Sequence, residues 1–152
     1  MYKISFEVRE LCVKNGFEVE VDLFSLDIDG VDYWIWQSLK AISPRVVVVE
    51  YQDILGPEKA LTVPYKPDFN RFDVHEDFNG ASLKAFVKLA KEKSYRLVGV
   101  NRYGFNAFFV KNGLCEDVLP EIEVASCFNH PKVKKGVTER YPAVKDLPWV
   151  EV

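Results

Sequence analysis

Three carboxylate side chains follow two short apolar runs of the sequence, and they are candidates for a site that does chemistry. Asp27 and Asp29 come after the run 21–26, and Glu50 comes after the four valines 46–49. Carboxylates accept hydrogen bonds from hydroxyl groups and ligate divalent cations, and a carboxyl group with a raised pKa can act as a general base. These types and positions predict a polar site that could bind a hydroxyl-bearing ligand or a cation.

A structural role is the alternative for each acid. Asp29 with Gly30 suits a turn, and Asp32 suits the cap of a following helix. Glu50 could instead hydrogen bond to the loop that follows it. Asp27 stands at a strand end, where a carboxylate needs a partner, so both interpretations of Asp27 stay open.

Three more side chains could line a pocket or exchange a proton. Tyr51 and Tyr65 could contact an acceptor molecule, or they could hold the long segment 52–79 against a sheet. His75 lies among acidic and aromatic residues, where it could act as a general base or simply be exposed. Trp34 and Trp36 are predicted to lie in the core, Asn106 in a turn, and the basic run 132–135 on a solvated helix face.

The elements that must position these residues follow from the apolar periodicity. Four β-branched valines without alternation predict a strand covered on both faces. A helix that ends at Ser43 is expected because Pro44 disfavours the helical conformation before it. Alternation over 2–8 also allows a strand there. The predicted elements are helix 4–15 ended by Gly16, strand 21–26, a helix from Asp32, strand 46–49, a helix capped by Ser82, and a hairpin of 95–100 with 106–110.

Two segments lack a sustained period. The stretch 52–79 is longer than ordinary connections, and loops of that length are usually functional. The stretch 115–152 is broken by four prolines and is expected to pack as short helices and turns. Alternating strands and helices predict an α/β open sheet, in which ligands bind beyond the carboxyl ends of the strands. That rule selects Asp27, Asp29 and Gly30 after the first strand and Glu50, Tyr51 and Gln52 after the second.

Composition limits the class of protein. The chain has 152 residues, 48% hydrophobic and 28% charged, which predicts one globular domain and excludes disorder. A net charge of -3 argues against a nucleic-acid partner. The charged N-terminus and the absence of a long apolar run argue against a signal peptide or membrane span. Three cysteines without a C-x-x-C pair suggest reduced thiols and a cytoplasmic location.

Several segments resemble, in order, those of the FkbM-type methyltransferases, class I enzymes that use S-adenosylmethionine. Residues 26–34, LDIDGVDYW, are similar to the family's IDIDGNDYW, and residues 49–52, VEYQ, are similar to its IEYN. Val31 and Gln52 stand where the family usually has Asn. The resemblance runs from about Val8 to the last residue. The remaining similar segments are VPY at 63–65, GASL at 80–83, YRLV at 95–98, GFNAFFV at 104–110 and LPWVEV at 147–152.

This resemblance implies a partial Rossmann-like class I fold. The family's sheet has the strand order 3-2-1-4-5-7-6, with strand 7 antiparallel beside strand 5. The predicted strands would be equivalent to strands 4, 5, 6 and 7, with flanking helices, in a single domain over 1–152. The family's glycine-rich cofactor turn and its ribose-binding acid lie upstream of the matched segments. No G-x-G-x-x-G and no P-loop occurs in the chain.

The function implied by the resemblance is O- or N-methyl transfer from S-adenosylmethionine to a small-molecule or saccharide acceptor. We expect Asp27, Glu50 and His75 to be catalytic and Asp27 and Asp29 to contact the cofactor. Tyr51 and Tyr65 would bind the acceptor, and no residue is assigned to a metal. Without the glycine-rich turn the isolated chain is expected to be inactive, unless an upstream or separate polypeptide supplies the cofactor-binding half. An Asp-x-Asp pair also suggests a glycosyltransferase, but the downstream segments do not fit that class.

A non-catalytic module is the alternative function. Without the central strands of the family's sheet, strand 23–26 would be a bare apolar edge, and bare edges pair with other chains. A homodimer through 23–26, or a complementing chain at the same edge, would cover it.

Overall fold

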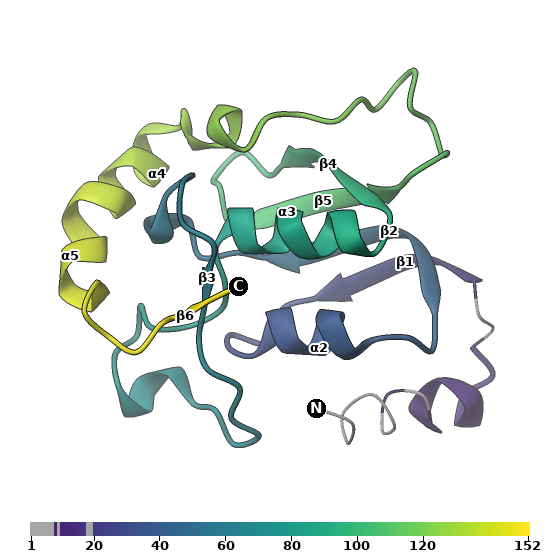
Figure 1. The fold of residues 1–152 in the computed structure, drawn as a ribbon, viewed down its shortest axis with the longest axis horizontal. Helices are drawn as coiled ribbons and strands as arrows, with labels where there is room; N and C mark the ends of the chain where they lie inside the picture. The colour runs from purple at the N-terminus through teal and green to yellow at the C-terminus, as the bar shows by residue number, and fades with distance from the viewer. Residues whose placement is uncertain (1–7, 9, 18–19) are drawn as a thin grey trace.

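An open four-stranded sheet forms the centre of the fold (Figure 1). The computed structural model describes residues 8, 10–17 and 20–152. The first two strands are parallel, and β5 runs antiparallel to both of its neighbours. The predicted mixed α/β class, open sheet and hairpin are therefore confirmed. In sheet order the strands are β1 (Glu20–Leu26), β2 (Ser43–Glu50), β5 (Asn106–Lys111) and β4 (Tyr95–Val100).

Two helices, α2 (Asp32–Ser38) and α3 (Leu83–Glu92), lie against the same face of this sheet (Figure 1). Trp36 is 1% exposed and its ring lies 5.2 Å from that of Phe109, which confirms the prediction of a core tryptophan. Ser82 caps α3 as expected, because its hydroxyl accepts a hydrogen bond from the Ala85 N–H at 3.1 Å.

The opposite face of the sheet is more open, which corrects the prediction for the valine strand. Val47 and Val49 are fully buried beneath the helices, whereas Val46 and Val48 on the other face are half-buried. Both helices connect strands on the same side of the sheet, so in the described part of the chain neither covers the second face. Leu23 of the edge strand β1 is 59% exposed there.

The helix that begins at Asp32 is shorter than expected. Leu39 adopts extended angles (φ −68°, ψ 110°), so the helix ends at Ser38 rather than Ser43. Ser43 and Pro44 already belong to β2 and align with the first residues of β1. The Leu39 N–H donates to the carbonyls of Ile35 and Trp36, which closes the last turn of α2.

At the N-terminal end, residues 10–14 are helical and the helix ends at Gly16 with φ 72°, as predicted. Residues 4–7 and 9 of the predicted helix, with the cap Ser5, lie outside the described residues. So does most of the alternative strand 2–8, whose one described residue, Val8, is helical.

The segment 52–79 contains little regular structure, as expected, and joins the tail in a second small core. Phe78 is 2% exposed, and its ring packs edge-on against that of Trp149 with the ring centroids 4.6 Å apart. The tail folds into short helices that run down one side of the molecule (Figure 1), which confirms the prediction of short elements packed on the domain. The short elements are η1 (Asp53–Leu55), β3 (Leu61–Thr62), η2 (Arg71–Asp73), η3 (Val124–Phe128), α4 (Pro131–Lys135), the π-helical turn η4 (Gly136–Arg140), α5 (Tyr141–Val144) and β6 (Val150–Glu151), which pairs with β3.

Two smaller predictions concern the hairpin and the cysteines. Asn106 is the first residue of β5, not a turn residue. Asn101 organises the turn instead, since its side-chain oxygen accepts from the Phe105 N–H at 3.0 Å. Cys12, Cys115 and Cys127 are all free thiols. None of the helices among the described residues has the length and apolar character needed to cross a membrane.

Candidate functional site

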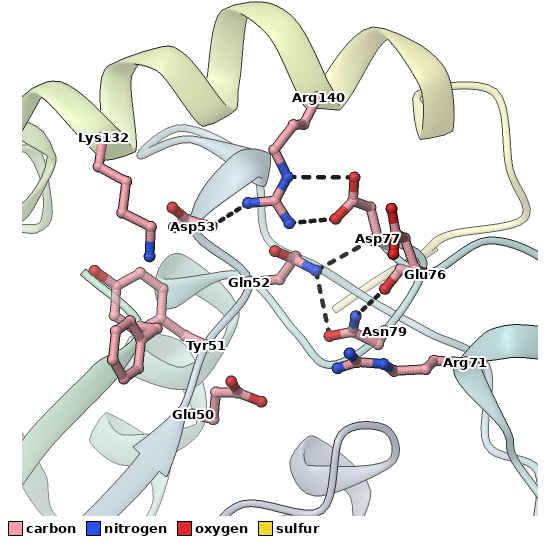
Figure 2. Close-up of a pocket in the computed structure, with 11 residues that line it drawn as sticks. Glu50, Tyr51, Gln52, Asp53, Arg71, Glu76, Asp77, Asn79, Lys132 and Arg140 are labelled. Carbon is pink, nitrogen blue, oxygen red and sulfur yellow. Dashed lines mark hydrogen bonds and ion pairs between the residues drawn. The ribbon is translucent and has the colours of Figure 1, made fainter. Parts of the chain in front are cut away.

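A cavity of about 500 Å³ opens where β2 ends (Figure 2). Glu50 is the last residue of β2, and the chain continues along the cavity wall through Tyr51, Gln52 and Asp53. This is the carboxyl edge of the parallel pair β1 and β2, where the strand order predicts a ligand site. The other lining residues come from the long segment (Arg71, Glu76, Asp77, Asn79), the hairpin turn (Phe105) and the tail (Lys132, Arg140).

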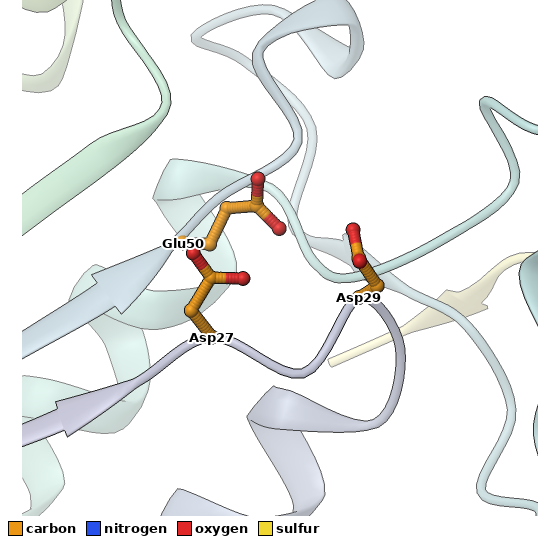
Figure 3. Close-up of side chains that lie close together, drawn as sticks. All are labelled: Asp27, Asp29 and Glu50. Atoms are coloured by element: carbon orange, nitrogen blue, oxygen red, sulfur yellow. The ribbon is translucent and has the colours of Figure 1, made fainter.

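The three predicted acids lie together beside this cavity (Figure 3). One oxygen from each of Asp27, Asp29 and Glu50 lies within 4.8 Å of the others. Asp27 and Asp29 are exposed on the loop after β1, and Asp29 has a positive φ of 55°. Arg71 forms an ion pair with the Asp29 carboxylate. Glu50 therefore faces both the acid cluster and the cavity, while Asp29 is already partly neutralised.

The carboxyl group of Glu50 has a strongly raised pKa. Burial is the main cause, and the negative charges of Asp27, Asp29 and Asp32 add to it, which together raise the pKa of Glu50 to about 7. The positive charge of Arg71 opposes this change. A carboxyl group with a pKa near the working pH can both accept and release a proton, as a general base must.

Asp32 shapes the loop that holds the other acids, which corrects its predicted role as a helix cap. Its carboxylate accepts hydrogen bonds from the N–H groups of Ile28 and Gly30, each at 3.0 Å. Asp32 is 1% exposed, and burial raises its pKa. The N-cap position belongs to Val31, which makes no side-chain cap. Asp32 thus uses the amide donors of the loop and fixes where Asp27 and Asp29 stand.

Three buried polar atoms in the cavity wall lack a hydrogen-bond partner among the described residues: Arg71 Nε, the Tyr51 hydroxyl and Asp53 Oδ2. Tyr51, predicted to bind the acceptor, is 2% exposed and its hydroxyl has no partner. Asp53 is 5% exposed, and its Oδ2 is also unpaired. Burial raises the pKa of both Tyr51 and Asp53. Since unpaired buried polar atoms are costly, this wall has unused capacity for a polar ligand or ordered water.

The long segment and the tail are tied together at the cavity by Arg140 (Figure 2). Its guanidinium binds the Asp77 carboxylate through two nitrogens, and its Nη1 lies 3.9 Å from Asp53 Oδ1. Gln52 adds a second connection, because its Nε2 donates to the Asp77 carbonyl at 3.1 Å and to Asn79 Oδ1 at 3.2 Å. These bonds hold one wall of the cavity in place.

Lys132 is the remaining basic residue of the cavity. Its Nζ lies 4.9 Å from the centre of the Phe105 ring. Lys132, Lys134 and Lys135 of the same run are all exposed, as predicted, and Lys132 also lines the cavity. Pro131 begins this helix, at a position where its fixed φ suits the helical conformation, and His130 caps it by accepting from the Lys132 N–H.

Two predicted site residues lie elsewhere. Tyr65 packs against the second small core and is not a cavity-lining residue. His75 Nδ1 accepts a hydrogen bond from the Asp77 N–H at 3.1 Å, and its carbonyl accepts from Phe78 N–H at 2.8 Å. His75 therefore stabilises a turn outside the cavity. Tyr51, by contrast, lines the cavity as predicted, and Asp27 and Asp29 lie beside its mouth.

Sequence reasoning missed Asp53, Asp77 and Arg140. One signal bears on Asp53 alone, namely the glycines Gly104 in the hairpin turn and Gly136 in the tail. A Cβ atom at Gly136 would lie 3.4 Å from Asp53 Oδ2, and one at Gly104 would lie 2.3 Å from Val133 Cγ2. Both glycines therefore mark where the tail approaches the cavity wall.

Comparison with known proteins gave no match of this chain to a family model, to a curated protein or to a solved structure. The resemblance to the methyltransferase family therefore rests on the segments quoted above.

Proposed function

We propose that this chain is a methyltransferase-like domain of FkbM type whose cavity at the end of β2 receives the acceptor molecule. The observation that supports this most is the position of Glu50, a partly buried carboxyl with a pKa of about 7 at the junction of the acid cluster and the cavity. In the proposed role, Glu50 accepts the proton that leaves an acceptor hydroxyl or amine.

The topology of the sheet supports the same proposal. The order β1-β2-β5-β4, with β5 antiparallel to both neighbours, equals the order 4-5-7-6 expected for this part of the class I fold. Many α/β proteins share partial strand orders of this kind, so the order supports the fold more strongly than the activity. The proposed activity depends on the site residues.

Acceptor binding can be assigned to residues of the cavity wall. The Tyr51 hydroxyl and Asp53 Oδ2 are unpaired in the described structure and could hydrogen bond to an acceptor that reaches them. Asp27 stands opposite Glu50 in the acid cluster, where its charge favours protonation of Glu50. Tyr65 and His75 have no part in the proposal, because their contacts are structural.

The residues of this chain fit S-adenosylmethionine only in part. Asp27 and Asp29 could accept hydrogen bonds from ribose hydroxyls, although Arg71 already engages Asp29. The amide donors of Ile28 and Gly30 are used by Asp32, and no glycine-rich turn lies among the 152 residues. We therefore propose no catalytic step through the cofactor and expect the chain alone to be inactive.

Calorimetry and the coding sequence test this proposal together. Titration of S-adenosylmethionine into the purified 1–152 chain should show no binding. If an in-frame strand and glycine-rich turn are encoded upstream of Met1, a protein that includes them should bind S-adenosylmethionine at micromolar concentrations and transfer its methyl group. Glu50→Gln should abolish this transfer, and Glu123→Gln should leave it intact. If neither the extended protein nor a complemented one binds S-adenosylmethionine, the enzyme proposal is overturned.

A second candidate, a non-catalytic module that self-associates, is favoured by the exposure of β1. This strand is the edge of the described sheet, and its Leu23 is 59% exposed. Unpaired edge strands offer backbone donors and acceptors to a second chain. Pairing of two β1 strands around a two-fold axis would cover both edges at once.

Sedimentation equilibrium tests the second candidate. A dimer that dissociates in Leu23→Lys but persists in Val118→Lys would support it, because Val118 is 71% exposed and lies in the loop after β5. A well-folded monomer over the whole concentration range would count against it.

A further inference from the structure

The charges around the cavity are unevenly paired. Arg140 is bound by Asp77, and Arg71 is bound by Asp29. Lys132, in contrast, has no carboxylate within 4.0 Å among the residues described. Lys132 is thus the lining cation without an ion pair, although its positive charge acts at longer range on the Asp53 carboxyl, whose pKa it lowers against the effect of burial. The face of Phe105 holds its ammonium group in place by a cation–π contact.

Some acids of the cavity also lack an ion-pair partner. Glu50 and Glu76 form no ion pair within the described structure, and Glu76 is exposed. Figure 2 places Lys132 on one side of the cavity and Glu76 with Arg71 on the other, with Glu50 below them. The cavity therefore presents an unpaired positive group on one side and unpaired acids elsewhere.

The wall beside Lys132 holds an independent sign of a ligand. Tyr51 is 2% exposed, and its hydroxyl has no hydrogen-bond partner in the described structure. Figure 2 shows the Lys132 side chain extending from the tail helix toward this tyrosine. A hydroxyl and an ammonium group together are suited to an oxyanion, since both can donate hydrogen bonds to its oxygens.

We propose that the cavity binds a small ligand that carries a carboxylate or phosphate at Lys132 and Tyr51 and a hydroxyl or amine at Glu50. This inference rests on the proposed function in one respect: the ligand would be the acceptor, with its nucleophilic group at Glu50. Neutral polyols would lack the group that Lys132 pairs with. Simple anions without a donor would meet the unpaired acids Glu50 and Glu76 with no compensating bond.

The two anionic groups share one chemistry and can be separated by experiment. Three probes of similar size suit the test: glycerol 3-phosphate, glycerate and glycerol. We would titrate each into the full ¹⁵N-labelled chain and follow the amide signals of Tyr51, Phe105 and Lys132. Glycerol 3-phosphate or glycerate should shift these signals at concentrations up to about 10 mM, a weak but measurable affinity, and glycerol should not. The stronger of the two anions identifies the preferred group.

Variants of the basic run provide the matched control. Lys132→Met should weaken binding of the preferred probe by about tenfold or more, because a charge-assisted contact is lost. Lys132→Arg should restore part of it. Lys134→Met, on the same helix but outside the cavity, should change nothing. Unchanged thermal melting of all three variants would show that a loss of binding is local.

Several outcomes would overturn the inference. They are equal binding of glycerol, unchanged binding by Lys132→Met, and absence of any shift at the cavity with both anions. These outcomes are separable from failure of the proposed function. Anion binding without methyl transfer in the extended protein would reject only the enzyme proposal, whereas methyl transfer to neutral acceptors alone would reject only the anionic ligand.

Discussion

Arg140 binds Asp77 across 63 residues of sequence, with its Nε 3.3 Å from Asp77 Oδ2. The same guanidinium lies 3.9 Å from Asp53, so one residue of the tail meets two acids of the long segment. The two acids are well buried, with side chains 10% and 8% exposed, while that of Arg140 is 47% exposed. Arg140 therefore neutralises the negative charge of carboxylates that would otherwise be buried in the cavity wall without a partner.

The first prediction concerns this ion pair. Arg140→Met should lower the free energy of unfolding by about 2 kcal/mol, because it leaves buried carboxylates without their partner. Urea denaturation of Arg140→Met, Asp77→Asn and the double variant should show non-additivity, with a coupling of about 1 kcal/mol or more. Lys135→Met, which breaks only an exposed pair with Glu139, should cost less than about 0.5 kcal/mol. Strict additivity would mean that the pair contributes nothing.

The second prediction concerns the pH dependence caused by Glu50. Its folded-state pKa of about 7 exceeds the ordinary value of 4.5. The folded protein therefore binds more protons between these two values, and the Glu50 contribution to the free energy of unfolding falls as pH rises through that window.

Glu50→Gln removes this contribution. The variant should be more stable than the parent by about 1–2 kcal/mol at alkaline pH, a figure reduced for solvent screening, with the difference vanishing below the ordinary carboxyl pKa. Chemical denaturation at a series of pH values measures it. Glu123→Gln, an exposed acid, serves as control. A parent-to-variant difference that does not depend on pH would contradict the raised pKa.

The third prediction concerns the glycine at the contact between hairpin and tail. Gly104 has φ 75°, and an added Cβ would lie 2.3 Å from Val133 Cγ2. Gly113 has φ 84°, and an added Cβ would meet nothing within 4 Å. Gly113→Ala should therefore cost about 1–2 kcal/mol from the backbone alone, and Gly104→Ala should cost more because Val133 must also move. Equal losses in thermal or urea unfolding would indicate that the tail accommodates the methyl group freely.

The fourth prediction concerns the loop that carries Asp27 and Asp29. Asp32→Asn replaces one of two accepting oxygens with an NH₂ group, which cannot accept from Ile28 or Gly30. The variant should lose about 1–3 kcal/mol in urea denaturation, because a buried amide donor is left unpaired. Asp146→Asn, 89% exposed, should be neutral within about 0.5 kcal/mol. Amide chemical shifts should change at residues 27–30 in the first variant alone.

Part of the fold and of the site could be predicted from local sequence. The end of β1 before Asp27, the end of β2 near Glu50, the cap Ser82 and the stop at Gly16 follow from short-range preferences. Because the carboxyl ends of neighbouring parallel strands meet at one edge, the three acids were expected together. The end of α2 at Ser38 was not predicted, because Pro44 limits only how far that helix can extend and does not say where it stops.

By itself, the sequence determined the α/β class, the open sheet and the acidic edge formed by Asp27, Asp29 and Glu50. Only the tertiary structure decided that Asp53, Asp77, Lys132 and Arg140 meet in one cavity, and that His75 and Tyr65 do not. The physical reason is the distance along the sequence over which each interaction acts. Turn, cap and strand preferences act over a few neighbouring residues, whereas the Arg140–Asp77 pair closes only after the tail has packed against the long segment. No local pattern encodes that contact.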